Sequence, residues 1–157
     1  MDGVLVNLFA KIKEIYPEYI EGNICKKMNS TMWTCVKKYQ GNGGKFWYDS
    51  LPMLDMNELI SFIKNYDKNF EILTAMGDPE FNSGDQKLQW IKEYLGEDIK
   101  VNLVRHGIDK AKFADPRSIL IDDKLKVITP FENAGGIGIL HTSAENSIKQ
   151  LKIILEL

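Results

Sequence analysis

Two adjacent carboxylates are the residues of this sequence whose spacing points most directly to chemistry. Asp122 and Asp123 follow the apolar run at residues 119–121, so both side chains are expected at the end of a buried strand. Adjacent carboxylates repel each other, and a hard divalent cation such as magnesium, which prefers oxygen ligands, would offset that repulsion. An aspartate pair that caps the following helix is an equally weighted interpretation.

Three other segments carry polar groups that could belong to the same site, although each has an ordinary explanation by itself. Asp2-Gly3 is a common turn sequence, and Gly3 would allow the backbone to approach a ligand closely. Thr74 ends the apolar run at residues 70–73, where a hydroxyl often forms a local turn. Lys110 and Lys112 would normally be solvated helix lysines.

The elements that must position these residues alternate between helices and strands. Strands are expected at residues 70–74, 100–104, 118–123 and 136–140, and helices up to residue 16, at 56–65, before Gly96, at 126–134 and at 144–155. Such alternation predicts an α/β fold with a parallel sheet covered on both faces. Reactive groups in such sheets gather at the carboxyl ends of the strands, where Thr74, Asp122 and Asp123 fall.

Composition limits the classes of function. The 157 residues fit one domain with a small cap, and a net charge of −2 argues against binding to a nucleic-acid polymer. There is no apolar run long enough to span a membrane, Asp2 is atypical of a signal peptide, and Cys25 and Cys35 lack a CxxC spacing. A soluble, cytoplasmic protein without membrane partners is expected. A homodimer is compatible with the sequence but not required by it.

The order of these segments resembles the four motifs of the haloacid dehalogenase superfamily: Asp-Gly-Val-Leu-Val, then strand-Thr, then Lys, then strand-Asp-Asp. Residues 45–52 (Lys-Phe-Trp-Tyr-Asp-Ser-Leu-Pro) and 119–141 are similar to segments of the 5′(3′)-deoxyribonucleotidase family in its phage and bacterial form. The resemblance covers nearly the whole chain. It implies a three-layer Rossmann-like parallel sheet, with residues 1–16 and 56–157 as the core and residues 17–55 as a small helical cap inserted after the first motif.

The resemblance also implies roles for individual residues. Asp2 matches the second aspartate of the first motif, which transfers protons and ligates magnesium through its carbonyl. Thr74, followed by Ala75, matches the hydroxyl position that holds the phosphoryl oxygens. Lys110 matches the lysine that neutralises charge, with Lys112 as its rival.

The remaining roles concern the metal and the substrate. Asp122 and Asp123 match the acidic metal ligands. In the aromatic cluster Phe46, Trp47 and Tyr48, at least two rings are expected to pack in the core of the cap, while one ring is a candidate for stacking on a nucleobase. Trp33 is a weaker candidate for the same role.

The sequence departs from the family pattern at the first motif, Asp-x-Asp, because it begins at x. The nucleophilic aspartate and the central strand before it are therefore expected upstream of Met1; a trimmed chain and a degenerate, non-catalytic relative are the alternatives. Without that strand, the sheet is expected to show a gap or an open edge at its middle.

The expected function is magnesium-dependent hydrolysis of phosphate monoesters, in particular deoxyribonucleoside 5′(3′)-monophosphates, through an aspartyl-phosphate. The alternative is a protein that binds phosphate or nucleotide without turnover. A receiver domain of the response-regulator type also combines paired Asp, Thr and Lys, but the long insert between Tyr16 and Met56 argues against it.

Overall fold

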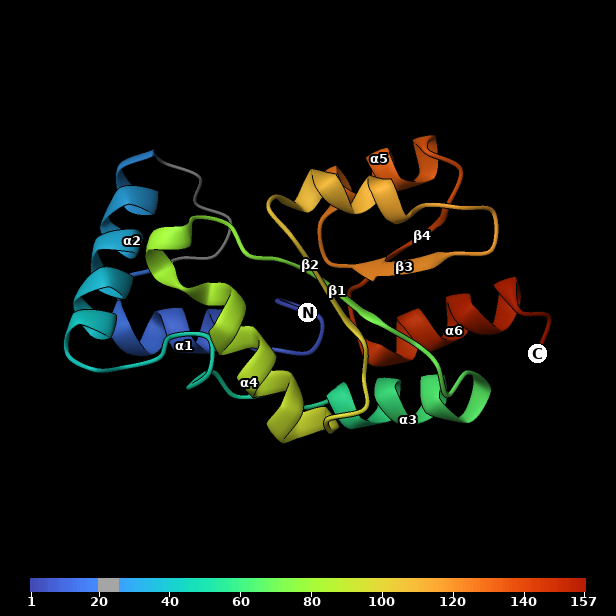
Figure 1. Cartoon of the computed structure of the whole chain (residues 1–157), viewed down its shortest axis with the longest axis horizontal. Helices are drawn as coiled ribbons and strands as arrows, with labels where there is room; N and C mark the ends of the chain where they lie inside the picture. Colours follow the sequence, from blue (N-terminus) through green and yellow to red (C-terminus); the bar gives the residue numbers. More distant parts are fainter. Residues whose placement is uncertain (20–25) are drawn as a thin grey trace.

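A computed structural model describes residues 1–19 and 26–157 (Figure 1). These residues form a mixed α/β structure, about 50% helical, with short parallel strands in two small sheets. The elements are, in chain order, α1 (Leu8–Ile15), α2 (Lys26–Gly41), α3 (Met56–Tyr66), β1 (Ile72–Ala75), the 3₁₀ helix η1 (Pro79–Phe81), α4 (Ser83–Leu95), β2 (Val101–Val104), the 3₁₀ helix η2 (Gly107–Phe113), β3 (Ile119–Asp122), α5 (Leu125–Asn133), β4 (Ile137–Leu140) and α6 (Ala144–Ile154). In these described ranges, no helix is both long and apolar enough for a bilayer crossing.

The elements predicted after residue 55 are all present, with slightly different ends. Local signals explain their boundaries. Helix α4 ends at Gly96, whose φ of 107° is easily adopted by glycine. Helix α6 begins after Ser143, whose side chain accepts a hydrogen bond from the backbone N–H of Asn146. The expected turn at residues 21–23, and Cys25, lie outside the described residues.

The strands pair in parallel, as predicted, but in two separate sheets. Strand β1 pairs with β2 from Ile72 opposite Val101 onward, and β3 pairs with β4 from Ile119 opposite Ile137 onward. In the part of the chain that the structure describes, no strand joins β1 to β3. The described strands therefore form two small parallel sheets, and the one continuous sheet that the sequence predicted is not observed.

The helices cover the strands from two sides. Helix α5 contacts β3, β4 and η2, while α6 contacts β4 and packs against α3. Figure 1 shows α5 and α6 on opposite faces of the β3–β4 pair. The loop that carries the N-terminus lies near the carboxyl ends of the strands, between the β3–β4 half and the half formed by α1, α2 and α4.

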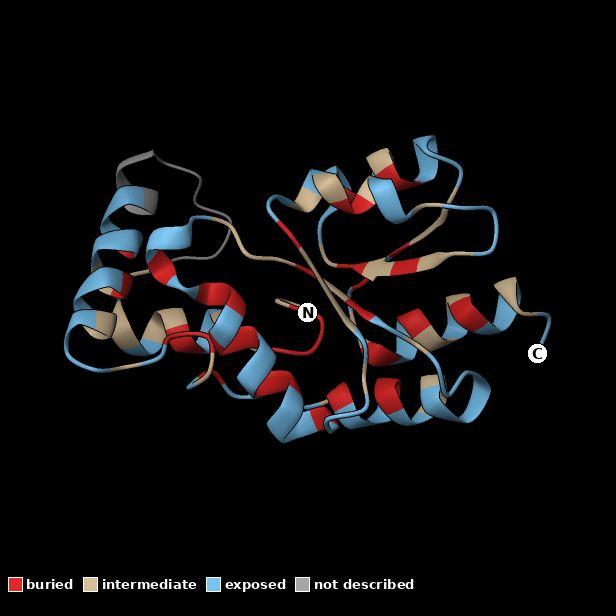
Figure 2. Cartoon of the chain, viewed as in Figure 1, coloured by how far each residue is buried: buried red, intermediate tan, exposed pale blue. Residues whose placement is uncertain are grey.

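The largest apolar core joins the N-terminal loop to α3, α4 and α6 (Figure 2). Trp90 and Ile139 are completely buried in it. The Nε1–H of Trp90 donates a 2.7 Å hydrogen bond to the carbonyl of Ser50, so the indole is both packed and satisfied. A second core lies around α5, where Leu120, Val127, Ile128 and Phe131 are buried.

A third apolar cluster lies next to α1 and consists of the buried residues Val36, Phe46, Trp47 and Phe81. The rings of Phe46 and Trp47 are buried, and Trp47 makes an edge contact with Phe81. The backbone N–H of Trp47 donates to Gln86 of α4 at 3.0 Å, which ties this cluster to the helix that borders the pocket described below. The boundaries of a separate cap at residues 17–55 stay a prediction.

Candidate functional site

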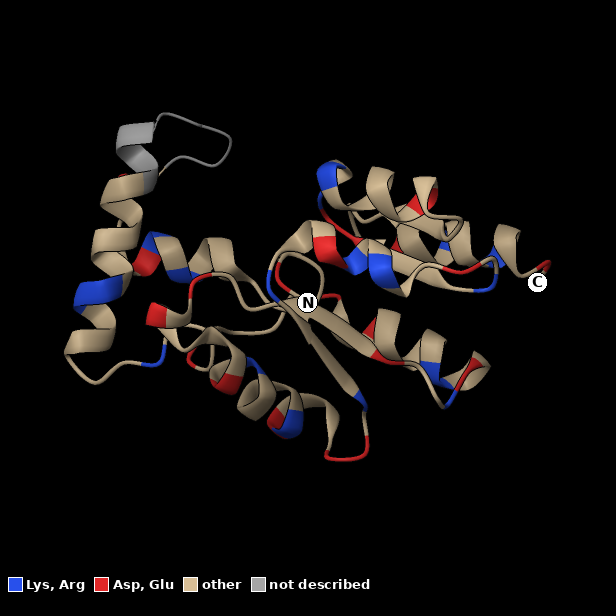
Figure 3. Ribbon diagram, turned by 45° about the horizontal axis from the view of Figure 1, so that its top comes forward, with Lys and Arg blue, Asp and Glu red and all other residues tan. Residues whose placement is uncertain are grey.

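The predicted polar residues meet in one pocket at the carboxyl ends of β1 and β3. Its volume is about 160 Å³. The lining residues are Met1, Asp2, Thr74, Ala75, Gly107, Lys110, Asp122, Asp123, Lys124, Lys126 and Val127. Figure 3 shows acidic and basic positions close to the N-terminus in the middle of the molecule. Four segments that are far apart in the sequence thus contribute to one small, charged pocket, as the parallel strands predicted.

The N-terminal loop places Asp2 at this pocket through a tight turn. The backbone N–H groups of Val4, Leu5 and Val6 all donate to the carbonyl of Met1, at 2.8–3.2 Å. Gly3 within the turn has a φ of 73°, a conformation that favours glycine.

Gly3 also brings the loop close to the paired acids. A Cβ at this position would lie 2.3 Å from Oδ2 of Asp123, so a larger residue could enter only if the carboxylate moved. Gly3 thus brings the loop close to Asp123, and the expected approach of its backbone to a ligand stays a prediction.

Lys110 and Asp122 form a buried ion pair at the centre of the pocket. Nζ of Lys110 lies 2.6 Å from Oδ2 of Asp122, and both side chains are about 95% buried, with 6% and 5% exposed. The other oxygen of Asp122 accepts the backbone N–H of Lys124 at 3.0 Å. Lys112 is 74% exposed and pairs with Asp109, so the structure brings Lys110 to the pocket and leaves its rival outside.

A second buried lysine, Lys87 of α4, was not among the predicted site residues. Its Nζ donates to Oδ2 of Asp2 and to the carbonyl of Ala75, both at 2.6 Å, and lies 3.5 Å from the hydroxyl of the buried Thr74. The sequence contained a signal for it, because Lys87 shares the inner face of α4 with Ser83, Trp90 and Ile91 at helical spacing. A lysine on an apolar helix face needs a buried partner, and Asp2 is that partner.

The environment of the pocket shifts the pKa values of two groups. Burial raises the pKa of Asp123, and the neighbouring Asp122 adds to the rise while Lys124 opposes it. Burial lowers the pKa of the Met1 amine to about 5, and Lys110 lowers it further while Asp2 and Asp122 act in the opposite direction.

The acidic residues have the donor chemistry for a hard cation, but the structure does not gather them into a formed metal centre. Within residues 1–19 and 26–157, no group of three or more acidic, His or Cys side chains is arranged to hold an ion. Oδ1 of Asp2 is buried without a hydrogen-bond partner among the described residues. The charged form of Asp123 is also disfavoured, because burial raises the pKa of its carboxyl group. Carboxylate oxygens of this kind are suitable ligands for a hard cation.

The aromatic residues lie beside the pocket and do not line it. Phe46 and Trp47 pack in the apolar cluster described above, which accords with core packing for both rings. Nζ of Lys87 lies 5.8 Å from the ring centre of Trp47, so this cluster borders the charged residues. Trp33 is 39% exposed, and its ring centre lies 4.8 Å from that of Phe81.

Comparison with models of known protein families finds no match for this chain, and comparison with curated protein sequences finds none either. The geometry of the pocket and the resemblance of the motifs are therefore the two sources for a functional proposal.

Proposed function

We propose that this chain is the greater part of a magnesium-dependent phosphatase that hydrolyses phosphate monoesters, with deoxyribonucleoside 5′(3′)-monophosphates as the preferred substrates. The observation that carries the proposal is the convergence of Asp2, Thr74, Lys110, Asp122 and Asp123 in one pocket. Chance would not be expected to bring together residues from four distant segments in the order of the phosphatase motifs. The proposal includes the finer fold, a three-layer Rossmann-like core of the haloacid dehalogenase type with a small helical cap.

The size and charge of the pocket fit a phosphoryl group. Pockets that enclose whole small molecules span about 300–1,000 Å³, whereas this one has about 160 Å³. A phosphoryl group would therefore enter, while sugar and base extend past the rim. Lys110 lies inside, and Lys124 and Lys126 are exposed at the rim, where they attract an anion.

The reaction requires an aspartate bonded to the Met1 nitrogen as the nucleophile. Its carboxylate oxygen would attack phosphorus, and the ester P–O bond would break as the leaving oxygen takes a proton from Asp2. Water would then attack the aspartyl-phosphate, with Asp2 accepting its proton, and release inorganic phosphate. Oδ2 of Asp2 is held by Lys87, so Oδ1, which lacks a described partner, is the oxygen assigned to proton transfer.

The other residues would position and neutralise charge. Thr74 would donate a hydrogen bond to a phosphoryl oxygen, and Lys110 would offset charge on the phosphoryl group, as preorganised donors do. The carbonyl of Asp2 and the carboxylates of Asp122 and Asp123 would hold magnesium. When bound, that ion would offset the negative charge of the phosphoryl oxygens and of the neighbouring carboxylates.

A non-catalytic phosphate- or nucleotide-binding protein is the second candidate. It is favoured by the two ion pairs, because the carboxylates of Asp2 and Asp122 are already paired with Lys87 and Lys110 and are therefore less available for proton transfer and metal binding.

Phosphate release from deoxyuridine and deoxythymidine 5′- and 3′-monophosphates separates the two candidates. The assay compares the chain with a form carrying an apolar strand that ends in Asp before Met1, each with magnesium and with a chelator. Magnesium-dependent turnover by the extended form alone supports the proposal, and Asp2→Asn is then expected to lower kcat by about 10²–10⁴-fold. The Lys112→Met control should keep full activity. Nucleotide binding without turnover by either form would favour the binding protein.

A further inference from the structure

Lys87 of α4 is a buried lysine beside the charged pocket, and it belongs to none of the motifs that predicted the pocket. Its side chain is only 3% exposed. Asp2, Thr74 and Ala75 line the pocket, whereas Lys87 does not, so its ammonium group lies behind these three residues. Figure 1 shows α4 close to the loop that carries the N-terminus.

The contacts of the Lys87 ammonium group are directed at residues of the site and not at the open space of the pocket. Its N–H groups donate to Oδ2 of Asp2 and to the carbonyl of Ala75, both at 2.6 Å. The hydroxyl oxygen of Thr74 lies 3.5 Å away. Since an ammonium group has three N–H donors, these contacts use its capacity. Lys87 is therefore placed to act on a substrate through Asp2 and not by touching the substrate.

The position of Lys87 is fixed by the way α4 is attached to the end of β1. The hydroxyl of Ser83, four residues earlier on the same helix face, donates to the carbonyl of Met76, and Lys87 donates to the carbonyl of Ala75. A Cβ at Gly84 would lie 2.9 Å from the sulfur of Met76, so the helix packs closely against this segment. Two consecutive carbonyls after Thr74 thus hold the inner face of α4.

The neighbouring residue, Gln86, attaches the same turn of α4 to the aromatic cluster. Its side-chain oxygen accepts the backbone N–H of Trp47 at 3.0 Å, and its amide group donates to the carbonyl of Phe81 at 3.2 Å. Gln86 is itself buried, and Nζ of Lys87 lies 5.8 Å from the ring centre of Trp47. Surrounding contacts of this kind hold a side chain in one geometry.

The ion pair restrains the carboxylate of Asp2. An ammonium group this deeply buried requires a charged partner, and Asp2, whose side chain is 22% exposed, supplies it. Because Oδ2 is held by Lys87, rotation of the carboxylate is restricted. Oδ1, which has no hydrogen-bond partner within the described ranges, therefore keeps one orientation. A group that transfers protons must lie within hydrogen-bond reach of the reacting oxygen, so this restraint matters for the reaction.

We propose that Lys87 is a positioning residue of the site, which holds Oδ2 of Asp2 so that Oδ1 meets the leaving oxygen and then the attacking water. Lys87 contacts neither the phosphoryl group nor the leaving group. Its role thus differs from that of Lys110, which lies inside the pocket. The inference rests on the proposed function, because proton transfer by Asp2 is part of that function.

Steady-state kinetics of the extended form defined above, with deoxythymidine 5′-monophosphate and magnesium, test the inference. Lys87→Met keeps the length of the side chain and removes the ammonium group. It should lower kcat by about 10²-fold, since a displacement of about 1 Å can have that effect, and change KM by less than about threefold. Lys92→Met is the matched control, because Lys92 lies on the same helix and is 65% exposed; it should leave kcat and KM unchanged.

A double-mutant cycle separates positioning from a general loss of structure. Asp2→Asn removes proton transfer, so adding Lys87→Met to that variant should lower kcat by less than about twofold. A purely structural role of Lys87 would lower kcat by the same factor in both backgrounds. Urea unfolding checks that each variant is folded. If Lys87→Met does not fold, Lys87→Gln takes its place, because its amide group can still donate to the carbonyl of Ala75.

The outcomes distinguish this inference from the proposed function. An active parent whose kcat falls on Lys87→Met only when Asp2 is present supports both. An active parent with unchanged kcat, with equal losses in both backgrounds, or with a raised KM alone would overturn the positioning role and retain the phosphatase. Absence of turnover by the parent would reject the phosphatase, and the positioning role would be rejected with it.

Discussion

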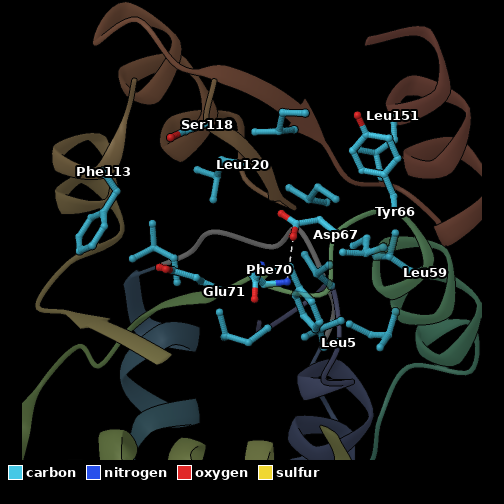
Figure 4. A pocket seen from close by; sticks show the side chains of 18 of the residues that line it. Leu5, Leu59, Tyr66, Asp67, Phe70, Glu71, Phe113, Ser118, Leu120 and Leu151 are labelled. Carbon is cyan, nitrogen blue, oxygen red and sulfur yellow. Dashed lines mark hydrogen bonds between the residues drawn. The ribbon is translucent and has the colours of Figure 1, made fainter. Parts of the chain in front are cut away.

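The charged pocket and a second cavity, of about 570 Å³ between β1 and β3, both have Met1 in their lining. They differ in the kind of interactions that their side chains make. In the charged pocket, Lys110 pairs with Asp122 and Lys87 pairs with Asp2, all four at hydrogen-bonding distance. The second cavity is lined by apolar side chains such as Leu59, Leu120 and Leu151, with polar residues that include Asp67 and Glu71 (Figure 4). The pocket is held in place by ion pairs and hydrogen bonds, whereas the second cavity is bounded mainly by apolar packing.

This difference indicates how the site is stabilised. The pocket residues reach their positions from β1, η2 and the β3–α5 turn, and those elements pack in the apolar cores described above. Loosely packed apolar side chains around the second cavity reduce the stability of the fold, but they do not contact the ion pairs of the charged pocket. Pocket geometry and overall stability are therefore expected to respond to different changes.

The largest predicted effect, for a chain whose first residue is Met1, is a loss of stability on mild acidification. The Met1 amine has a pKa lowered from 8.0 to about 5 by burial, so the folded protein binds this proton less readily than the unfolded chain. Its contribution is fully present above pH 8 and is lost as the pH falls toward 5, by about 4 kcal/mol at 1.36 kcal/mol per pKa unit. Urea unfolding between pH 8.5 and 5 measures the slope, and an N-acetylated chain is the control. Equal slopes for both chains would contradict the prediction.

The next prediction concerns the ion pair of the pocket. Lys110→Met leaves Asp122 buried without its charged partner and should lower the free energy of unfolding by about 3–5 kcal/mol. Lys112→Met removes a lysine that is 74% exposed and should leave stability unchanged within error. Urea denaturation compares the variants. Similar losses for both would show that burial of the Lys110 pair has no special importance.

Much of this arrangement could be predicted from the sequence. The apolar runs and Gly96 predicted the positions of the strands and helices after residue 55, because the spacing of apolar residues indicates which side of each segment is buried. The position of Thr74, Asp122 and Asp123 at strand ends predicted that they would meet, since parallel strands share a carboxyl edge.

Other features depend on tertiary contacts that no local pattern records. Which of Lys110 and Lys112 enters the pocket depends on the turn of η2, and only the structure distinguishes the buried side chain from the exposed one. Lys87 was missed because its partner Asp2 is 85 positions away. The close approach of Gly3 to Asp123 is likewise a meeting of two distant loops.

That close approach gives a third prediction. Gly3→Ala adds a Cβ that would lie 2.3 Å from Asp123 in a backbone conformation with a φ of 73°, so both crowding and strain oppose it. A loss of about 2–4 kcal/mol is expected. Gly43→Ala is the matched control, since its φ is 90° and nothing lies within 4 Å; strain alone should lower stability by about 1–2 kcal/mol. Thermal or urea unfolding measures the loss of stability in both variants. Equal losses would mean that the side chain of Asp123 moves aside without a measurable effect on stability.

The smallest predicted effect is that of a larger side chain in the cavity between β1 and β3. Ile63→Phe adds volume next to an open cavity, so the free energy of unfolding should change by less than about 1 kcal/mol, whereas Ile139→Phe in the closed core should lower it by about 1–3 kcal/mol. Urea unfolding of the two variants gives the comparison. Equal losses in the two variants would contradict this prediction, because an added ring costs little only where the surrounding side chains leave room for it.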